Sequence, residues 1–476
     1  MPKNILIFSD GTGQAGGMSP DQNLSNIYKL FRASRVDPGN PIDPKDQVAF
    51  YDAGLGTQRD EGRIHVRALQ AVRKAISAGI GVGVSRNIAD CYEAILKYYE
   101  PGDRVFLFGF SRGAYTARCV AGVMNLCGIP TRSPDGGCLP RCGKDLRAIA
   151  DEAVRSVYEH GAGRERAKFE PEREELARRF KSRYGSDLGG KANVAPYFIG
   201  VFDTVAALGA KGLKRFLLNT AAGAAILTIA ACLALTGHLF GLDFMPSFMG
   251  FCAALIALVL LSSLRYSLRV IHDYPNPGES RWHLAGWHSG FYDRYLDKQV
   301  RYARHALAID ETREDFARVP WGVKGDIVVH DAGEPEWLQQ IWFAGCHSDI
   351  GGSYEDNESR LSDIALSWMV EQITALPHSV LLDSSKLHFF PDPGGVQHSE
   401  VEAVRDLYPR WIPKSWRLSW KERPRVEVLG APLHPSVFER IKLPGVLCSG
   451  VRKSYRPEAL REDPRLREYY RTDPVL

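Results

Sequence analysis

The chain has 476 residues, of which 45% are hydrophobic and 24% charged, so its composition is that of a globular protein and excludes wholesale disorder. This length exceeds the usual size of one hydrophobic core, so we expect one large α/β domain with insertions, or two domains. The formal net charge of +4 is small for the length and gives no reason to expect a nucleic-acid partner, which needs a concentrated basic face.

Nine cysteines are scattered along the chain, and the sequence opens without a signal-peptide pattern. Both observations favour free thiols in a reducing compartment. The pair Cys138 and Cys142 lies in a loop rich in glycine and proline, and no second pair stands at zinc-site spacing. We therefore expect neither a metal site nor a cofactor.

Short apolar segments alternate with helical patterns along the chain. Residues 4–8 predict a buried strand that ends in the glycine loop 9–13. Further strands are expected at 48–51, 104–108, 197–202 and 340–345, and helices at 23–33, 85–99 and 113–126. This alternation predicts an α/β fold like that of the α/β-hydrolases, with a mostly parallel sheet and helices on both faces.

Other segments depart from this alternation. Residues 145–184 are charged with helical spacing, which indicates a helical insertion, either a lid or a solvated helical pair. Residues 304–307, which include His305, also look helical. The chain is thereby divided into a first core part at 1–210, a hydrophobic hairpin at 211–269, a second core part at 270–390 and a Pro/Arg-rich extension at 391–476.

Residues 216–264 contain no Lys or Arg, and Asp243 is their one formal charge. Two apolar stretches, 216–236 and 244–264, each approach the ~20 residues that a helix needs to cross a bilayer. Basic residues on both flanks predict a two-helix transmembrane hairpin with the catalytic body in the cytoplasm: Lys211, Lys214, Arg215, Arg265 and Arg269. The alternatives are a buried helical hairpin and a hairpin that lies in one leaflet.

The segment Gly109-Phe110-Ser111-Arg112-Gly113 matches a nucleophile elbow, in which a serine occupies a strained turn between a strand and a helix. The pentapeptide alone is a weak signal. Here it follows an apolar strand directly and opens a helical pattern, which is the context that the elbow requires. We therefore predict Ser111 as a catalytic nucleophile.

A serine nucleophile needs a base, and the base needs an acid that orients it. Asp203 ends the strand 197–202 and is predicted as the acid, with the N-cap of a following helix as its alternative role. His347 follows the strand 340–345 in a glycine-rich turn and is predicted as the base. His305 competes for the role of base, although we favour a structural or substrate-facing role for it, and Asp349 is a reserve acid.

The oxyanion of an acyl-transfer reaction needs two donors near the nucleophile. We expect one from the backbone amide of Arg112 and the other from Gly11 or Thr12 in the first glycine loop. That loop lacks the lysine and the spacing of a P-loop, which argues against nucleotide binding.

Four motifs in this order resemble a known family: Phe8-Ser9-Asp10-Gly11-Thr12, Gly109-Phe110-Ser111-Arg112-Gly113-Ala114-Tyr115, Phe202-Asp203-Thr204 and Gly345-Cys346-His347-Ser348-Asp349-Ile350-Gly351-Gly352. It is the uncharacterised α/β-hydrolase family related to the catalytic domain of type VI secretion system phospholipase effectors. The resemblance runs from residue 3 to about 376 outside the hydrophobic insertion. It implies a triad of Ser111, Asp203 and His347 and the hydrolysis of phospholipid acyl esters.

The sequence thus predicts a membrane-anchored serine hydrolase that cleaves lipid acyl esters, with a lipid or other acyl ester and the membrane as its partners. The alternatives are a non-enzymatic membrane protein on a hydrolase scaffold and a hydrolase of soluble esters, thioesters or a storage polyester.

Overall fold

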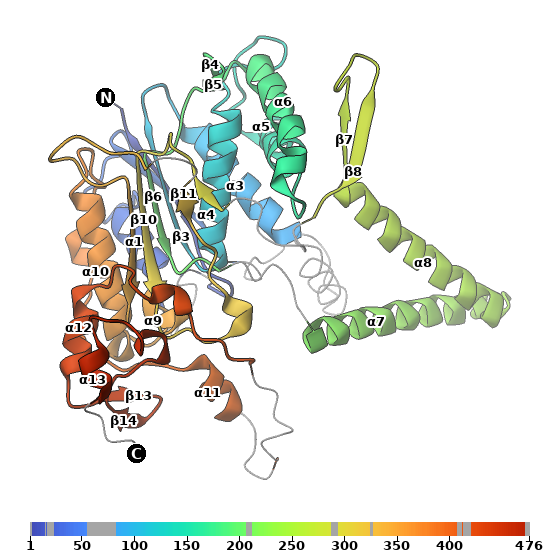
Figure 1. The fold of residues 1–476 in the computed structure, drawn as a ribbon. Coiled ribbons are helices and arrows are strands. Elements are labelled where there is room, and N and C mark those ends of the chain that lie inside the picture. The colour runs from blue at the N-terminus through green and yellow to red at the C-terminus, as the bar shows by residue number, and fades with distance from the viewer. Residues whose placement is uncertain are drawn as a thin grey trace.

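The computed structural model describes residues 2–14, 16, 23–54, 82–205, 212–286, 294–323, 327–406, 412 and 420–471. At its centre lies a six-stranded sheet in the order β12-β10-β6-β3-β1-β2 (Figure 1). The strands are β1 (Asn4–Ser9), β2 (Gln47–Asp52), β3 (Arg104–Phe110), β6 (Phe198–Phe202), β10 (Tyr302–Ala308) and β12 (Leu338–Phe343). All neighbouring strands of this sheet pair in parallel, which confirms the predicted α/β class.

Alternate residues of the central strands enter two hydrophobic clusters, one on each face of the sheet. In β1, Ile5 and Ile7 belong to the cluster formed with α3 (Val82–Tyr98) and α4 (Arg112–Cys127). Leu6 and Phe8 belong to the other, formed with α1 (Asn26–Ser34) and α10 (Arg360–Thr374). Since successive side chains of a strand point to opposite faces, apolar residues at every position require cover on both faces.

The charged segment 145–184 is helical, as predicted. It comprises α5 (Gly143–Asp151), a π-helix (Glu152–Tyr158) and α6 (Arg166–Tyr184). These helices pack on α3 and α4, so they add an outer layer to one side of the sheet (Figure 1).

The helical prediction for residues 304–307 was wrong, because they belong to strand β10 between β6 and β12. All seven residues of β10 are buried. Alanine, arginine and leucine favour helices locally, but burial between two parallel strands overrides that preference.

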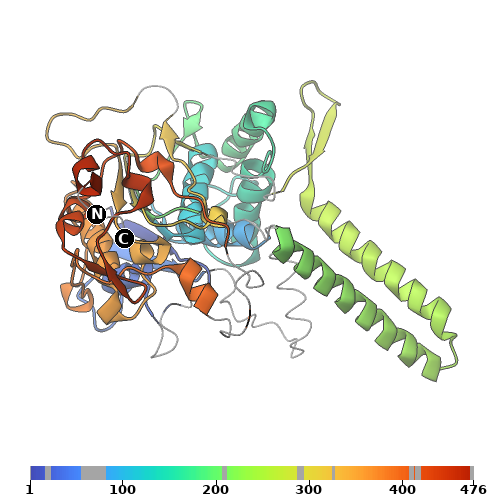
Figure 2. The ribbon, with the colours of Figure 1, turned by 60° about the horizontal axis from the view of Figure 1, so that its bottom comes forward.

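Two long helices, α7 (Gly212–Leu239) and α8 (Phe244–Ser267), project from the body and pack on each other (Figures 1 and 2). No residue of α8 is buried. By length and composition α8 is the one helix of the described residues that could cross a membrane, while the apolar part found in α7, Gly223–Leu239, is shorter. An antiparallel hairpin of β7 (Leu268–His272) and β8 (Ser280–Leu284) continues α8 directly.

The described part of the C-terminal extension is folded. It contains α11 (Glu400–Asp406), α12 (Pro435–Lys442), β13 (Val446–Cys448), β14 (Val451–Lys453) and α13 (Arg467–Arg471). A third hydrophobic cluster joins its residues to Leu307 of β10 and Trp342 of β12. The remaining short elements are β4 (Asp187–Leu188), β5 (Lys191–Ala192), β9 (Tyr295–Leu296), β11 (Gly322–Val323), α9 (His347–Gly351) and isolated 3-10 turns.

Candidate active site

Ser111 lies in a sharp turn between β3 and α4, with φ 58° and ψ −120°. This is a strained conformation for a residue other than glycine. A Cβ on Gly109 would lie 2.4 Å from the Gly113 carbonyl oxygen, and a Cβ on Gly113 would lie 2.0 Å from the Ser9 carbonyl oxygen. The two glycines therefore let the turn form against its own backbone and against β1.

His347 and Asp203 meet at the carboxyl end of the sheet. Asp203 follows β6, and His347 is the first residue of the short helix α9 after β12. His347 Nδ1 lies 2.6 Å from Asp203 Oδ2, and because an ionised carboxylate only accepts, Nδ1–H is the donor. Ser111 follows β3, the neighbour of β6, and its amide donates to the Phe202 carbonyl at 3.1 Å. The three residues predicted as a triad thus follow strands that end at one edge.

Arg425, which the sequence analysis did not single out, forms a buried ion pair with Asp203. Its guanidinium donates to both carboxylate oxygens, at 2.5 Å to Oδ1 and 3.1 Å to Oδ2. It also donates to the carbonyls of Ala308 and Phe316. One arginine in an arginine-rich extension, 222 positions from its partner, carries no sequence signal that would have identified it.

Asp203 is fully buried, yet it is held in the ionised form. Burial raises the pKa of this carboxyl, but the charge of Arg425 and the hydrogen bond from His347 outweigh burial and hold the pKa below its ordinary value. Its remaining acceptor capacity takes the amide of Ala308 at 3.1 Å. The alternative role of Asp203, as the N-cap of a following helix, is not seen, because Thr204 and Val205, which would open that helix, are not helical and Val205 forms a β-bridge with Arg318.

Two aromatic rings fix the His347 imidazole. Phe110 stacks on it at 4.7 Å between ring centroids, and Phe316 meets it edge-on at 5.2 Å. The His347 amide donates to Glu311 at 3.4 Å. His347 Nε2 is buried and has no hydrogen-bond partner among the described residues. The ring is thus oriented through Nδ1, with the other nitrogen left to accept a proton.

The carboxylate of Asp10, at the start of the first glycine loop, is buried and accepts hydrogen bonds from its neighbours. Asp10 accepts from the amide of Gly11 at 2.7 Å, from Ser25 Oγ at 2.5 Å and from the Tyr51 hydroxyl at 2.6 Å. The Gly11 amide is therefore already in use. The amides of Thr12 and Arg112, the other predicted oxyanion donors, make no hydrogen bond within the described residues.

A second buried carboxyl, that of Asp52, lies near Asp10. Asp52, at the end of β2, accepts from Ser9 Oγ at 2.9 Å and from Asn87 Nδ2 at 2.8 Å. Burial raises the pKa of Asp52 to about 8 and that of Asp10 to about 6, and among the described residues no cation pairs with either carboxyl, unlike Asp203.

The two reserve residues have structural contacts. His305 is fully buried in β10, where its Nε2 accepts from the Thr204 amide at 3.3 Å. Asp349 accepts from the Cys346 amide at 3.0 Å and lies 2.7 Å from His398 Nδ1, so it caps α9 instead of orienting His347. The reactive roles of Ser111, Asp203 and His347 stay predictions.

Comparison with known proteins finds three to which parts of this chain are similar. An uncharacterised protein of Saccharomyces cerevisiae, YEL023C, is 30% identical over 130 residues, which are 27% of this chain and 18% of the yeast protein. A crystal structure of an uncharacterised Pseudomonas aeruginosa protein matches at 16% identity and TM-score 0.34, over 82% of this chain and 48% of that one. The Tle1 effector bound to the VgrG spike of the type VI secretion system matches at 16% identity and TM-score 0.27, over 76% of this chain and 53% of the other.

The chain therefore spans less than a fifth of the yeast protein and about half of each solved chain. A family model supplies the assignment, because it matches residues 3–242 and 270–372, which is most of the chain. The break between the two matched parts falls on α8. The protein belongs to the family of Tle1-like catalytic domains of type VI secretion system phospholipase effectors.

Proposed function

We propose that this protein is a serine hydrolase that cleaves the acyl esters of phospholipids, with Ser111 as nucleophile, His347 as base and Asp203 as the orienting acid. The observation that carries the proposal is the buried Asp203–His347 pair, which leaves Nε2 without a partner among the described residues, at the edge where the elbow serine lies. Membership of a phospholipase effector family supplies the substrate class.

In this mechanism His347 Nε2 takes the proton of the Ser111 hydroxyl, and the serine oxygen attacks the ester carbonyl. The amides of Thr12 and Arg112 stabilise the oxyanion, since the Gly11 amide is used by Asp10. The protonated His347 then gives its proton to the leaving alcohol. Water, activated by the same imidazole, releases the fatty acid, while Asp203 stabilises the imidazolium in both steps.

A positively charged side chain next to the nucleophile favours a substrate with an anionic phosphate group over a neutral ester. The Arg112 guanidinium has no ion-pair partner in the part of the chain that the structure describes, and burial lowers its pKa to about 10, so it stays charged at neutral pH. A guanidinium binds phosphate oxygens with two parallel hydrogen bonds.

We further propose that α7 and α8 anchor the enzyme in a membrane as a two-helix hairpin, with the catalytic body on the cytoplasmic side. The apolar, unburied surface of α8 supports anchoring. Of the flanking basic residues that favour a cytoplasmic body, Arg265 and Arg269 lie in the described residues, whereas Lys211 lies outside them.

The test is hydrolysis of phospholipid vesicles by the purified protein in detergent, together with labelling by a fluorophosphonate probe. We expect Ser111→Ala to lose both fatty-acid release and labelling, and Ser367→Ala on α10 to retain both. Labelling that persists in Ser111→Ala would refute the assignment of the nucleophile. Labelling without vesicle hydrolysis would contradict the lipid substrate and favour a soluble ester.

A further inference from the structure

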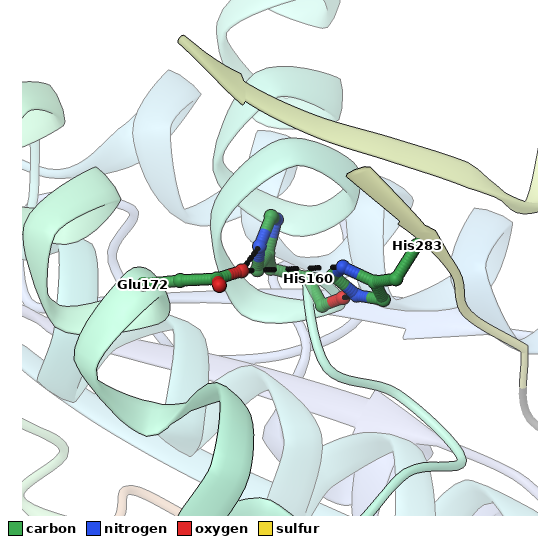
Figure 3. A group of neighbouring side chains, drawn as sticks. All are labelled: His160, Glu172 and His283. Atoms are coloured by element: carbon green, nitrogen blue, oxygen red, sulfur yellow. Dashed lines mark hydrogen bonds and ion pairs between the residues drawn. The ribbon is translucent and has the colours of Figure 1, made fainter. Parts of the chain in front are cut away.

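His160, Glu172 and His283 form a compact cluster outside the candidate active site (Figure 3). His160 follows the π-helix, Glu172 lies on α6, and His283 lies on β8. One potential ligand atom from each residue lies within 4.8 Å of the other two. His160 and Glu172 are buried, and the His283 side chain is 12% exposed.

The hydrogen bonds of the cluster decide where its protons lie. His283 Nε2 is 2.5 Å from the carbonyl oxygen of His160, and because a carbonyl only accepts, Nε2 carries the proton. In the neutral imidazole Nδ1 then presents a lone pair, 4.0 Å from Glu172 Oε2. His160 Nε2 lies 2.8 Å from the same oxygen, so without an ion Nε2–H donates to the carboxylate; a bound ion would replace this proton and leave the neutral ring protonated on Nδ1. A lone pair and a carboxylate oxygen thus face each other, an arrangement that a cation between them stabilises.

We propose that His160 Nε2, Glu172 Oε2 and His283 Nδ1 bind a divalent transition-metal ion of the zinc type. Two imidazoles and one carboxylate are a ligand set that zinc uses in tetrahedral sites, with water at the fourth position. Bond lengths near 2.1 Å place neighbouring tetrahedral ligands about 3.4 Å apart, between the distances of 2.8 and 4.0 Å found here. The carbonyl that accepts from His283 Nε2 orients the ring, as such partners do for metal-bound histidines.

The charges around the cluster allow a cation to bind. Arg281 NH1 lies 3.7 Å from the other carboxylate oxygen of Glu172, and its side chain is 55% exposed, so it can turn to solvent. Arg269 is paired with Glu159 at 3.4 Å. The Phe169 ring packs against His283 at 4.0 Å between centroids and shields the site from water on that side.

The position of the cluster gives the ion a structural role. Its ligands join the outer helical layer to the β7–β8 hairpin, which continues α8 without an intervening residue. Other contacts at this junction include the Gly286 amide to the Ala162 carbonyl at 2.9 Å, Arg164 to the Leu284 carbonyl at 2.8 Å and Arg179 to the His272 carbonyl at 2.7 Å, besides the Arg269–Glu159 pair. A bound ion would fix the base of the helical pair on the catalytic body. This inference does not depend on the proposed activity.

Metal binding can be tested on the full chain in detergent, without a histidine tag. After treatment with a chelator and dialysis, protein is incubated with Zn²⁺, separated from free ion and analysed for metal content. We expect the wild type to take up about one equivalent and its melting temperature to rise with Zn²⁺. Co²⁺ should give the visible absorption of a tetrahedral site with nitrogen and oxygen ligands.

His283→Ala and Glu172→Gln should each weaken Zn²⁺ binding at least about 100-fold and lose the shift in melting temperature. His272→Ala, an exposed histidine of the same hairpin, and Ser111→Ala should bind like the wild type. Glu172→Gln keeps the shape of the side chain, so a loss of binding there with an unchanged circular dichroism spectrum is a loss of ligation. The proposal is overturned if folded wild type takes up no ion, or if both ligand variants retain it.

Discussion

At the scale of single residues, the environment of Asp203 explains how a carboxylate with no exposed surface remains charged. Each of its two oxygens accepts two hydrogen bonds, from Arg425 and Ala308 on one side and from Arg425 and His347 on the other. Removing one partner of such a buried pair leaves an uncompensated charge. Arg425 touches no reacting atom in the proposed mechanism, so it is a positioning residue.

Arg425→Gln should therefore impair both activity and stability. Without the arginine, burial raises the pKa of Asp203, so the carboxyl becomes protonated at higher pH and the acid limb of the kcat/KM profile moves upward. We expect kcat/KM at pH 7 to fall at least about 10-fold and the free energy of unfolding to fall by about 3–5 kcal/mol. The pH–rate profile and thermal unfolding measure these effects.

Arg461→Gln is the matched control, because Arg461 is exposed in the same extension and pairs with an exposed glutamate. Surface pairs of this kind contribute about 0–1 kcal/mol, so neither quantity should change noticeably. A folded Arg425→Gln protein with an unmoved acid limb would contradict the positioning role.

Asp52 predicts a second pH effect, on stability. Its pKa is raised by burial to about 8 in the folded state, well above that of an unfolded aspartate, so the folded state binds this proton more tightly. The stabilisation is complete below about pH 4 and is lost as the pH rises through about 8. Asp10, with a pKa of about 6, acts in the same direction at lower pH.

Asp52→Asn should remove this loss while its amide oxygen still accepts from Ser9 and Asn87. Between pH 6 and 8.5 the wild type should lose on the order of 2–3 kcal/mol of unfolding free energy more than the variant. Thermal unfolding across this range measures the difference. Asp46→Asn, an exposed carboxyl just before β2, should follow the wild type. Parallel curves for wild type and Asp52→Asn would show that Asp52 does not titrate in this range.

At the scale of elements, α8 differs from the helices that cover the two faces of the sheet, α1, α3, α4 and α10, because none of its residues is buried. Large apolar side chains stand on its surface; Leu258 and Leu261, for example, are about two-thirds exposed. An exposed apolar surface of this length in water favours association or membrane insertion.

Leu258→Arg combined with Leu261→Arg should weaken membrane attachment. Each arginine near the centre of a spanning helix costs about 2.5–3.5 kcal/mol on insertion scales. We expect the double variant to lose most of its co-flotation with phospholipid vesicles, whereas Leu188→Arg, an equally exposed leucine outside the hairpin, should float like the wild type. Unchanged flotation of the double variant would contradict anchoring through α8.

At the scale of the whole molecule, the C-terminal extension completes the sheet. Strand β12 lies at the edge, and Trp342 exchanges backbone hydrogen bonds with the extension, donating to the Pro432 carbonyl at 3.0 Å and accepting from the His434 amide at 2.9 Å. The third hydrophobic cluster lies behind this contact, and Arg425 reaches Asp203 from the same segment. The extension therefore covers an edge that would otherwise pair with other chains.

A chain that ends at residue 390 should consequently lose vesicle hydrolysis and aggregate, because it exposes β12 and Trp342 and removes the partner of Asp203. A chain that ends at residue 471 removes no described residue and should behave like the full chain. Size-exclusion chromatography and the vesicle assay compare the two. Full activity of the shorter chain would show that the extension is dispensable.

The local sequence determined those elements in which pattern and packing agree. The parallel strands β1, β3 and β6, the helices that cover them and the elbow at Ser111 follow from continuous apolar runs, helical spacing and two glycines that a tight turn requires. Asp203 and His347 were predicted as acid and base because each follows a strand in the chain order of the α/β-hydrolases. The carboxyl ends of parallel strands share one edge, and there the two side chains lie 2.6 Å apart, while their catalytic roles stay predictions.

Features that depend on residues far apart in the sequence were decided by the tertiary structure alone. β10 reads as a helix locally, and burial between two strands makes it a strand. Arg425 contacts Asp203 although more than two hundred residues separate them in the sequence. His160, Glu172 and His283 come from three separate segments that share no sequence motif. Such contacts depend on the packing of whole elements, and no local pattern of residue types encodes which side chains that packing brings within reach.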